Sequence, residues 1–541
     1  MHASEDLMVY LLLSLLILPS IAWVFLENRS WENDAVEYAG YSIESNRRLF
    51  SDSIFTWLDS MFTRYRVKPP LLMWVGQWFV PLGVFLGPVR KGLLFAPIVF
   101  SLLSVFISYT AFKRMFNDRL IALAGAVFIS ASPLFIGLST RFLTEPLLLL
   151  VVVWSMYVYA SYLSWDRYYA LLHLLSVFFV SLLTKFSGPF YLILPSIVIL
   201  YHVFRLGFGV FFMELRQTAA KHAGMAAVTL FLFSLTSRLY YLNVRHYLNH
   251  ANNALSGKWV LNQTFIESMA RLLRESAGVF FLDYSVFFFL ILASAGLFHL
   301  RKSVTVRNSP QAVVFPLQIL LVLLVIGYLR LTDPWRFVFP VLPYVAAVMC
   351  WSLRIIGRKT VTMLAIVVFL LQAILLHSYA FGILRDYPQT PHLGIPFTHY
   401  HLTPYYQPGI MGDYNRLLDV LCNHSSQNTV LLTRGKNWQY WSASKTLWLY
   451  STDRYSDKCQ FINYPRKNES YLKQLANRTD YYAVIYDYLM ETNGTNNLSL
   501  SNEFGPCMSL NLTPYNNIKT VSTSSSIKLC GNYSAFKPAL S

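Results

Sequence analysis

Long apolar segments alternate with short polar ones along most of the chain, up to about residue 381. A helix needs about 20 mostly apolar residues to cross a membrane, and about eleven segments meet this requirement. We therefore predict a multi-pass α-helical membrane protein with spans at 8–26, 92–112, 120–136, 146–163, 168–184, 189–205, 223–241, 279–299, 312–330, 337–353 and 360–381. A further apolar stretch at 71–88 is interrupted by Pro81, Gly83, Gly87 and Pro88, and we expect it to lie as a helix against the outer face.

The composition favours a membrane protein over a soluble one. Of the 541 residues, 55% are hydrophobic and 13% are charged, whereas a soluble domain carries about 25% charged residues. The first apolar segment lacks the basic residues that begin a signal peptide, and no small-residue cleavage site follows it. We therefore interpret this segment as a span.

Lysine and arginine residues give the predicted orientation, because short cytoplasmic loops are enriched in them. With a cytoplasmic N-terminus, every short inner loop is basic; these loops hold Lys113, Arg114, Arg119, Arg167, Arg205, Arg216, Lys221, Arg301, Lys302, Arg307, Arg354, Arg358 and Lys359. They account for much of the formal net charge of +17, which leaves no case for nucleic-acid binding. The odd number of spans then places the C-terminus outside the cytoplasm. We predict a plasma-membrane protein, with the endoplasmic reticulum membrane as the alternative.

Residues 385–541 form a second predicted domain after the transmembrane domain 1–384. The segments 429–433 and 482–486 are typical of short buried strands and 413–421 of a helix, which together predict a small extracytoplasmic α/β domain. All nine Asn-x-Ser/Thr sequons fall on predicted outer segments, and Cys350 lies within a span. We expect two disulfides in an oxidising compartment, of open connectivity, among Cys422, Cys459, Cys507 and Cys530.

The outer loop at 27–90 departs from this charge pattern and is the strongest candidate for a site. Its acidic, basic and aromatic residues include Asp34, Glu37, Tyr38, Arg47, Arg48, Arg64, Arg66, Lys68 and Trp74. A carboxylate and several cations held at a membrane surface suit a reaction on a lipid-linked anionic substrate. The alternative is a polar loop that only tethers two helices.

Ionisable residues also lie at the outer ends of other spans: Arg141 with Glu145, Lys185, Asp333 with Arg336, and Arg245 with His246 and His250. Such residues are costly near the membrane unless they are solvated or paired, so we expect them to converge with Asp34 on one outer cavity. The alternative is that they snorkel to the interface or only hold helices together. The chain has no P-loop and no GxGxxG, HExxH or CxxC motif.

These residues carry a resemblance to a known group. Asp34 with Tyr38, Lys68-Pro69-Pro70-Leu71 with Trp74, Arg141 with Glu145, Leu183-Thr184-Lys185, and Arg336-Phe337-Val338-Phe339-Pro340 occur in the order of the lipid A aminoarabinose transferases and protein O-mannosyltransferases. The chain resembles these type C (GT-C) membrane glycosyltransferases, which use polyprenyl-phosphate sugars, over roughly residues 1–350.

The resemblance implies an inverting sugar transfer to a hydroxyl acceptor. Asp34 would be the catalytic base and Glu145 a second catalytic acid, while Lys68, Lys185, Arg66 and Arg336 would bind the donor phosphate. Tyr38, Glu37, Arg141 and Trp74 would support them. Some relatives carry an acid near a bound metal where this chain has Val67, so we predict neither a metal nor another cofactor.

Two other functions remain open. A transporter or flippase of a lipid-linked sugar would bind the same cargo without breaking a bond, and a non-catalytic subunit of an envelope or luminal complex would use its outer domain. The acceptor of the transferase is open among lipids, glycans and proteins.

Overall fold

The computed structural model describes residues 2–26, 33–63, 68–86, 89–205, 207–253, 263–300, 311–331, 334–381 and 383–384, together with five strands near the C-terminus. The chain divides into two compact units. One comprises Met1–Phe25, Ser42–Phe79 and Leu94–Pro404, and the other Leu26–Tyr41, Val80–Leu93 and Tyr405–Ser541.

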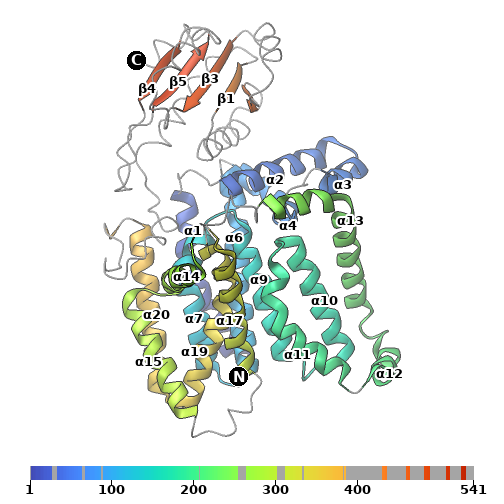
Figure 1. Ribbon diagram of the computed structural model, residues 1–541, viewed down its shortest axis with the longest axis vertical. Helices are drawn as coiled ribbons and strands as arrows, with labels where there is room; N and C mark the ends of the chain where they lie inside the picture. Colours follow the sequence, from blue (N-terminus) through green and yellow to red (C-terminus); the bar gives the residue numbers. More distant parts are fainter. Residues whose placement is uncertain are drawn as a thin grey trace. The chain divides into compact units, whose positions relative to one another are not determined.

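Helices form nearly all of the described chain before residue 385 (Figure 1). In chain order they are α1 (His2–Leu26), α2 (Asn33–Ser51), α3 (Ile54–Thr63), α4 (Leu71–Gly76), the 3-10 helix η1 (Gln77–Phe79), α5 (Val80–Leu86), α6 (Val89–Phe116), α7 (Arg119–Ala131), α8 (Pro133–Ser139), α9 (Thr144–Ser161), α10 (Arg167–Thr184), η2 (Gly188–Leu192), α11 (Ile193–Phe204), α12 (Phe208–Thr218), α13 (Ala223–Asn253), α14 (Phe265–Phe280), α15 (Asp283–Leu300), α17 (Gln311–Leu329), α18 (Pro334–Val338), η4 (Phe339–Val341), α19 (Leu342–Ile356) and α20 (Lys359–Ala380).

Each of the eleven predicted apolar segments is helical, but those at 120–136, 189–205, 279–299 and 337–353 divide between two or more helices. Within the described residues, seven helices are long and apolar enough to cross a membrane, and up to ten spans result if each of three bent helix pairs is one span. The bent pairs are α7 with α8, α11 with α12, and α14 with α15, and the apolar part of α17, Val313–Leu329, is shorter. The protein is a multi-pass membrane protein. Helix length and composition support seven to ten spans within the described residues, and the predicted number of eleven stays a prediction.

A buried glutamine satisfies the backbone at two of these bends. Gln372 on α20 is fully buried, and its Nε2 donates to the carbonyls of Ala131 (2.8 Å) and Phe280 (3.2 Å). Its Oε1 accepts from the amide of Leu282 at 3.0 Å. An unpaired backbone group in a membrane costs several kcal/mol, so this one side chain stabilises the ends of α7 and α14 together.

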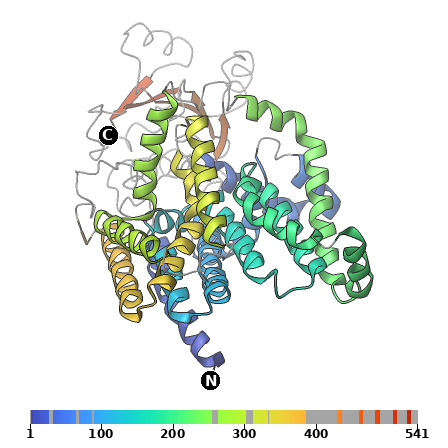
Figure 2. The same cartoon turned by 60° about the horizontal axis from the view of Figure 1, so that its bottom comes forward.

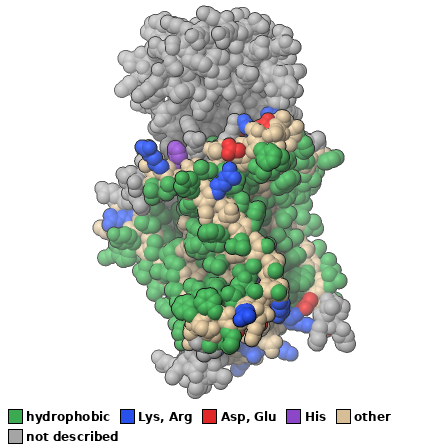
Figure 3. Space-filling model, turned by 90° about the vertical axis from the view of Figure 1, so that its right-hand side faces the viewer, with side chains coloured by type: hydrophobic (Ala, Val, Ile, Leu, Met, Phe, Trp, Pro, Cys, Tyr) green, Lys and Arg blue, Asp and Glu red, His purple; other side chains and the backbone are tan. Residues whose placement is uncertain are grey.

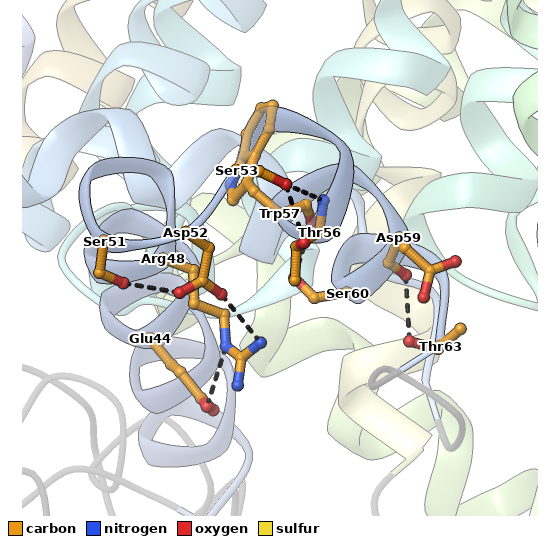
Figure 4. Close-up of polar contacts among 10 residues, drawn as sticks. All are labelled: Glu44, Arg48, Ser51, Asp52, Ser53, Thr56, Trp57, Asp59, Ser60 and Thr63. Carbon is orange, nitrogen blue, oxygen red and sulfur yellow. Dashed lines mark hydrogen bonds and ion pairs between the residues drawn. The ribbon is translucent and has the colours of Figure 1, made fainter.

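The outer loop predicted at 27–90 is largely helical. Figure 4 shows the junction of α2 and α3, where the guanidinium of Arg48 lies between Glu44 (3.5 Å) and Asp52 (3.3 Å). The hydroxyl of Ser53 accepts from the amide of Thr56 at 3.2 Å, which caps the first turn of α3. Local ion pairs and a cap thus support two helices that are not spans, since α2 is polar and α3 has only 10 residues.

Two other predicted segments differ in detail from the structure. The segment predicted as a helix at 71–88 is helical from Leu71 to Leu86, with the 3-10 helix η1 between α4 and α5. The span predicted at 223–241 continues as α13 to Asn253, and Nδ2 of Asn243 donates to the carbonyl of Phe62 on α3 at 3.0 Å. A tertiary contact with the first outer region therefore extends this helix beyond its apolar part.

The surface of the helical unit is strongly apolar. On the face that Figure 3 shows, hydrophobic side chains cover the middle, and charged side chains gather toward the two ends. On α13, for example, Leu230 and Phe231 are 66% and 61% exposed. Exposed apolar side chains in the middle and charges at both ends are what a lipid-facing surface requires.

A mixed five-stranded sheet forms the described C-terminal part. Its strands are β1 (Thr429–Arg434), β2 (Cys459–Asn463), β3 (Tyr481–Asp487), β4 (Cys507–Asn511) and β5 (Ser526–Gly531), in the order β2-β1-β3-β5-β4. β1 pairs in parallel with β2 and β3, and β5 pairs antiparallel with β3 and β4. The predicted strands at 429–433 and 482–486 are confirmed, whereas the predicted helix at 413–421 and Cys422 lie outside the described residues.

The register of this sheet bears on the cysteines. Cys507 is the direct partner of Cys530 in the antiparallel pair β4–β5. Directly opposed residues of antiparallel strands have Cα atoms about 4.5–5.5 Å apart, which is within the range that a disulfide spans. The predicted pairing of the tail cysteines stays a prediction, and the register favours one particular pair.

Candidate active site

A buried carboxylate with two cations lies where α9 begins. Glu145, the second residue of α9, has no exposed surface. Its Oε1 accepts from Nζ of Lys185 at 3.0 Å and from Nε of Arg336 at 2.7 Å. The side chains of Lys185 and Arg336 are each 18% exposed, and two cations with one carboxylate leave this triad a formal charge of +1.

Helix ends supply the three charges. Glu145 lies in the first turn of α9, and Lys185 directly follows the last turn of α10. A carboxylate is favoured near a helix N-terminus and a cation near a C-terminus, because the helix dipole is oriented in this way. Arg336 comes from the short helix α18, so the triad joins three segments that are distant in sequence.

Two buried tyrosines hold the segments of Lys185 and Arg336 together. The hydroxyl of Tyr191 donates to the carbonyl of Phe337 at 2.7 Å, and the hydroxyl of Tyr344 donates to the carbonyl of Tyr191 at 2.6 Å. Nζ of Lys185 also lies 4.7 Å from the centre of the Phe337 ring, a cation–π contact. The backbone next to Arg336 is therefore fixed against the segment that follows Lys185.

A second buried glutamine anchors that same segment. Gln318 on α17 has no exposed surface, its Nε2 donates to the carbonyl of Phe190 at 3.1 Å, and its Oε1 accepts from the amide of Leu194 at 3.0 Å. It satisfies backbone groups at the break between η2 and α11. The sequence analysis did not identify Gln318, Tyr191 or Tyr344. Gln318 could have been found, because a glutamine in an apolar segment is unfavourable unless its amide forms hydrogen bonds.

The first outer region packs against the chain just before Glu145. Gly76, at the end of α4, lies so close to the ring of Phe142 and the hydroxyl of Ser42 that a side chain there would collide with both. The indole of Trp74 donates to the carbonyl of Met61 at 3.2 Å, which ties α4 to α3. The C-terminal end of α4 is thus held beside Phe142, three residues before Glu145.

The predicted site residues divide into three groups. Glu145, Lys185 and Arg336 come together in one ion-pair group. Trp74 is buried in the same unit, Lys68 is half-buried before α4, and Arg141 lies four residues before Glu145. Asp34, Glu37 and Tyr38 lie on the first turns of α2 in the other unit, where Asp34 and Glu37 are half-buried and Tyr38 is buried. Arg66 and Asp333 lie outside the described residues.

Arg245 and His246 are exposed side chains on α13 and are not members of the triad. Among the described residues, no three His, Cys, Asp or Glu side chains are grouped as metal ligands. The prediction that the site uses no metal therefore stays a prediction, as does the single outer cavity expected to include Asp34.

Comparison with known proteins identifies the fold. No family model and no curated protein matches the sequence. Among solved structures, the chain is similar to ArnT from Cupriavidus metallidurans in the apo state, with a TM-score of 0.53 at 14% identity over 98% of both chains. It is also similar to the structure of that ArnT bound to undecaprenyl phosphate, with a TM-score of 0.56 at 12% identity over 97% of this chain and 98% of the other. The fold is thus ArnT-like along nearly the whole chain, which confirms the predicted resemblance at the level of the fold.

Proposed function

We propose that the protein is a membrane glycosyltransferase that moves a sugar from a polyprenyl phosphate to a hydroxyl acceptor on the non-cytoplasmic side. The observation that carries the proposal is the triad of Glu145, Lys185 and Arg336. It is a positively charged, partly exposed group at helix ends of an ArnT-like fold. A structure of that fold, from Cupriavidus metallidurans, is described as bound to undecaprenyl phosphate.

The triad suits the donor phosphate electrostatically. Lys185 and Arg336 would face the phosphate, and Lys68 and Arg66 of the first outer region would add further positive charge. When the sugar leaves, the electron pair of the broken C1–O bond goes to the phosphate, so negative charge increases in the transition state. Fixed cations stabilise that charge most when their positions are set in advance.

Glu145 is better suited to set those positions than to accept a proton. Its accepting oxygen is already engaged by two cations at 2.7 and 3.0 Å, and its side chain is fully buried. We infer that Glu145 orients Lys185 and Arg336. Its role in catalysis would then be to position these cations and not to transfer a proton. The hydrogen bonds from Tyr344 to Tyr191 and from Tyr191 to Phe337 would also hold Arg336 in position, because they fix the backbone of the residue next to it.

Asp34 is the proposed general base. The acceptor hydroxyl attacks C1 of the sugar, its proton passes to the Asp34 carboxylate, and the bond from C1 to the phosphate oxygen breaks. A single displacement of this kind inverts the anomeric centre. The half-buried position of Asp34 on the first turn of α2 is compatible with access of a substrate hydroxyl.

A donor assay in proteoliposomes tests the proposal. With undecaprenyl- or dolichyl-phosphate sugars, the transferase releases free polyprenyl phosphate when an acceptor is present; a flippase would only move the donor between leaflets, and a non-catalytic subunit would do neither. Lys185→Ala should weaken donor binding roughly tenfold to 150-fold, the equivalent of about 1.5–3 kcal/mol for a charged hydrogen bond. Lys221→Ala is the matched control, because Lys221 is 69% exposed and pairs with Asp166 rather than Glu145.

A further inference from the structure

Helix α12 turns sharply away from the helix before it. The axis of α12 makes an angle of 87° with that of the preceding segment Gly188–Phe204. The turn occurs at Gly207, whose φ of 89° is readily adopted only by glycine. Figures 1 and 2 show α12 at the periphery of the helical unit, between α11 and α13. α13 is long and apolar enough to cross a membrane, and α12 is nearly perpendicular to the apolar segment before it. This is the geometry expected of a helix that lies along the membrane surface.

This surface is the one remote from Glu145. α10 has 18 residues between Arg167 and the triad's Lys185, which corresponds to a length of about 27 Å and nearly spans the hydrocarbon core of a bilayer. α12 is tied to the start of α10 by the ion pair of Glu214 with Arg167 at 3.7 Å. The proposed site and α12 therefore lie at opposite membrane faces.

An apolar face of α12 is exposed. Phe211 is buried and packs against Phe204 with ring centres 5.2 Å apart, but Phe208 and Phe212 are 64% and 60% exposed. Residues four apart on a helix lie about 40° apart around its axis, so these two phenylalanines point to the same side. Gln217, also exposed, lies about 140° around the axis from Phe212.

Aromatic and cationic residues surround α12 at the same level. Trp165 and Tyr169, near the start of α10, have ring centres 5.0 Å apart. Tyr169 also stacks on the ring of His222, a residue that follows α12, with ring centres 4.5 Å apart. Tryptophan and tyrosine gather at the headgroup level of membranes. Arg205, before α12, and Arg216, in its last turn, are both exposed. The two nearby acids are engaged, Glu214 by Arg167 and Asp166 by Lys221 and His222.

We propose that α12 is an interfacial helix that binds the lipid surface of the leaflet opposite the Glu145 triad. Phe208 and Phe212 insert among the acyl chains, and Arg205 and Arg216 bind anionic phospholipid headgroups. Exposed aromatic side chains on one face with cations beside them are the features by which amphipathic helices bind anionic membranes. The excess of positive charge around the helix supports a negatively charged lipid surface over a second copy of the chain.

Photocrosslinking of the full chain in vesicles tests the proposal. p-Benzoylphenylalanine in place of Phe212 resembles the native ring, and the same residue in place of Gln217, on a different side of α12, is the matched control. In vesicles of phosphatidylcholine and phosphatidylglycerol, position 212 should give several-fold more lipid adducts than position 217. Adducts to a second copy of the chain, or equal lipid yields at both positions, would overturn the proposal.

The headgroups that are captured test the role of the arginines. Phosphatidylglycerol should be enriched among the adducts of position 212 relative to its share of the vesicle, and Arg205→Gln with Arg216→Gln should return it to that share. Enrichment that is absent from the start, or that persists in this double variant, would overturn the assignment of anionic headgroups to these arginines.

Discussion

Replacement of Glu145 by glutamine tests the triad itself. Glu145→Gln keeps the shape of a fully buried side chain but leaves Lys185 and Arg336 without their shared carboxylate. Removal of one partner of a buried ion pair costs about 3–5 kcal/mol. Because both cations are 18% exposed and water relieves part of this cost, we expect the lower end, about 3 kcal/mol.

The same substitution separates positioning from binding. The formal charge of the group rises from +1 to +2, so attraction for an anionic donor is kept while the geometry of the cations is lost. We therefore expect donor affinity within a few fold of the wild type and a marked fall in the transfer rate. Titration of a labelled polyprenyl-phosphate sugar gives the affinity, and single-turnover transfer at saturating donor gives the rate.

A double-mutant cycle gives the refuting result. Adding Arg336→Gln to Glu145→Gln removes one of the two charges that the first substitution left without their carboxylate, so the two changes should not be additive in unfolding free energy. We expect a coupling well above the roughly 0.3–0.5 kcal/mol found between independent sites. Additivity within that limit, together with unchanged stability of Glu145→Gln, would refute the view that the triad is a coupled ion-pair group.

Three further predictions follow from other contacts. Tyr191→Phe leaves the partly buried carbonyl of Phe337 without its donor; we expect a loss of about 1 kcal/mol in thermal unfolding experiments and slower transfer at saturating donor, and wild-type stability would argue against the hydrogen bond. Peptide mapping without reduction should find Cys507 linked to Cys530, as their register favours, and two free thiols there would contradict it. The pKa of Asp166 lies below its usual range because hydrogen bonds from His222, and then from Lys221, stabilise its carboxylate. The ionised Asp166 therefore stabilises the fold above its unfolded pKa of about 4, and this contribution is lost as the pH falls through the lower folded pKa. The difference in thermal midpoint between the wild type and Asp166→Asn should shrink as the pH falls below about 4, and a difference that stays constant would contradict this prediction.

The membrane architecture was largely predictable because the length of apolar segments is a direct physical requirement of the bilayer. All eleven segments are helical, although four of them divide between two or more helices. Their bends were not predictable, since the break before Pro133 and the one after Phe280 are stabilised by Gln372, about 240 and 90 residues away in sequence. Long-range contacts of this kind leave no periodic pattern in the sequence.

The charged residues of the candidate site could be predicted from the sequence, but the residues that hold them in position could not. Glu145, Lys185 and Arg336 stood out because ionisable residues at span ends are costly alone, and the structure pairs them. Tyr191 and Tyr344 did not stand out, because a tyrosine in an apolar run is ordinary until its hydroxyl is seen to bond a particular carbonyl. The helical first outer region was missed because its helices are stabilised by local ion pairs and caps.

The measurement that tests the central claim most directly is transfer by Asp34→Asn from a radiolabelled polyprenyl-phosphate sugar in proteoliposomes, with Glu37→Gln as the neighbouring control on the same helix. Asparagine keeps the size of the side chain but lacks a basic carboxylate. The account predicts that transfer falls about 10²–10⁴-fold, the usual contribution of a general base, while donor binding stays near the wild type and Glu37→Gln is affected less. Wild-type turnover by Asp34→Asn would contradict it.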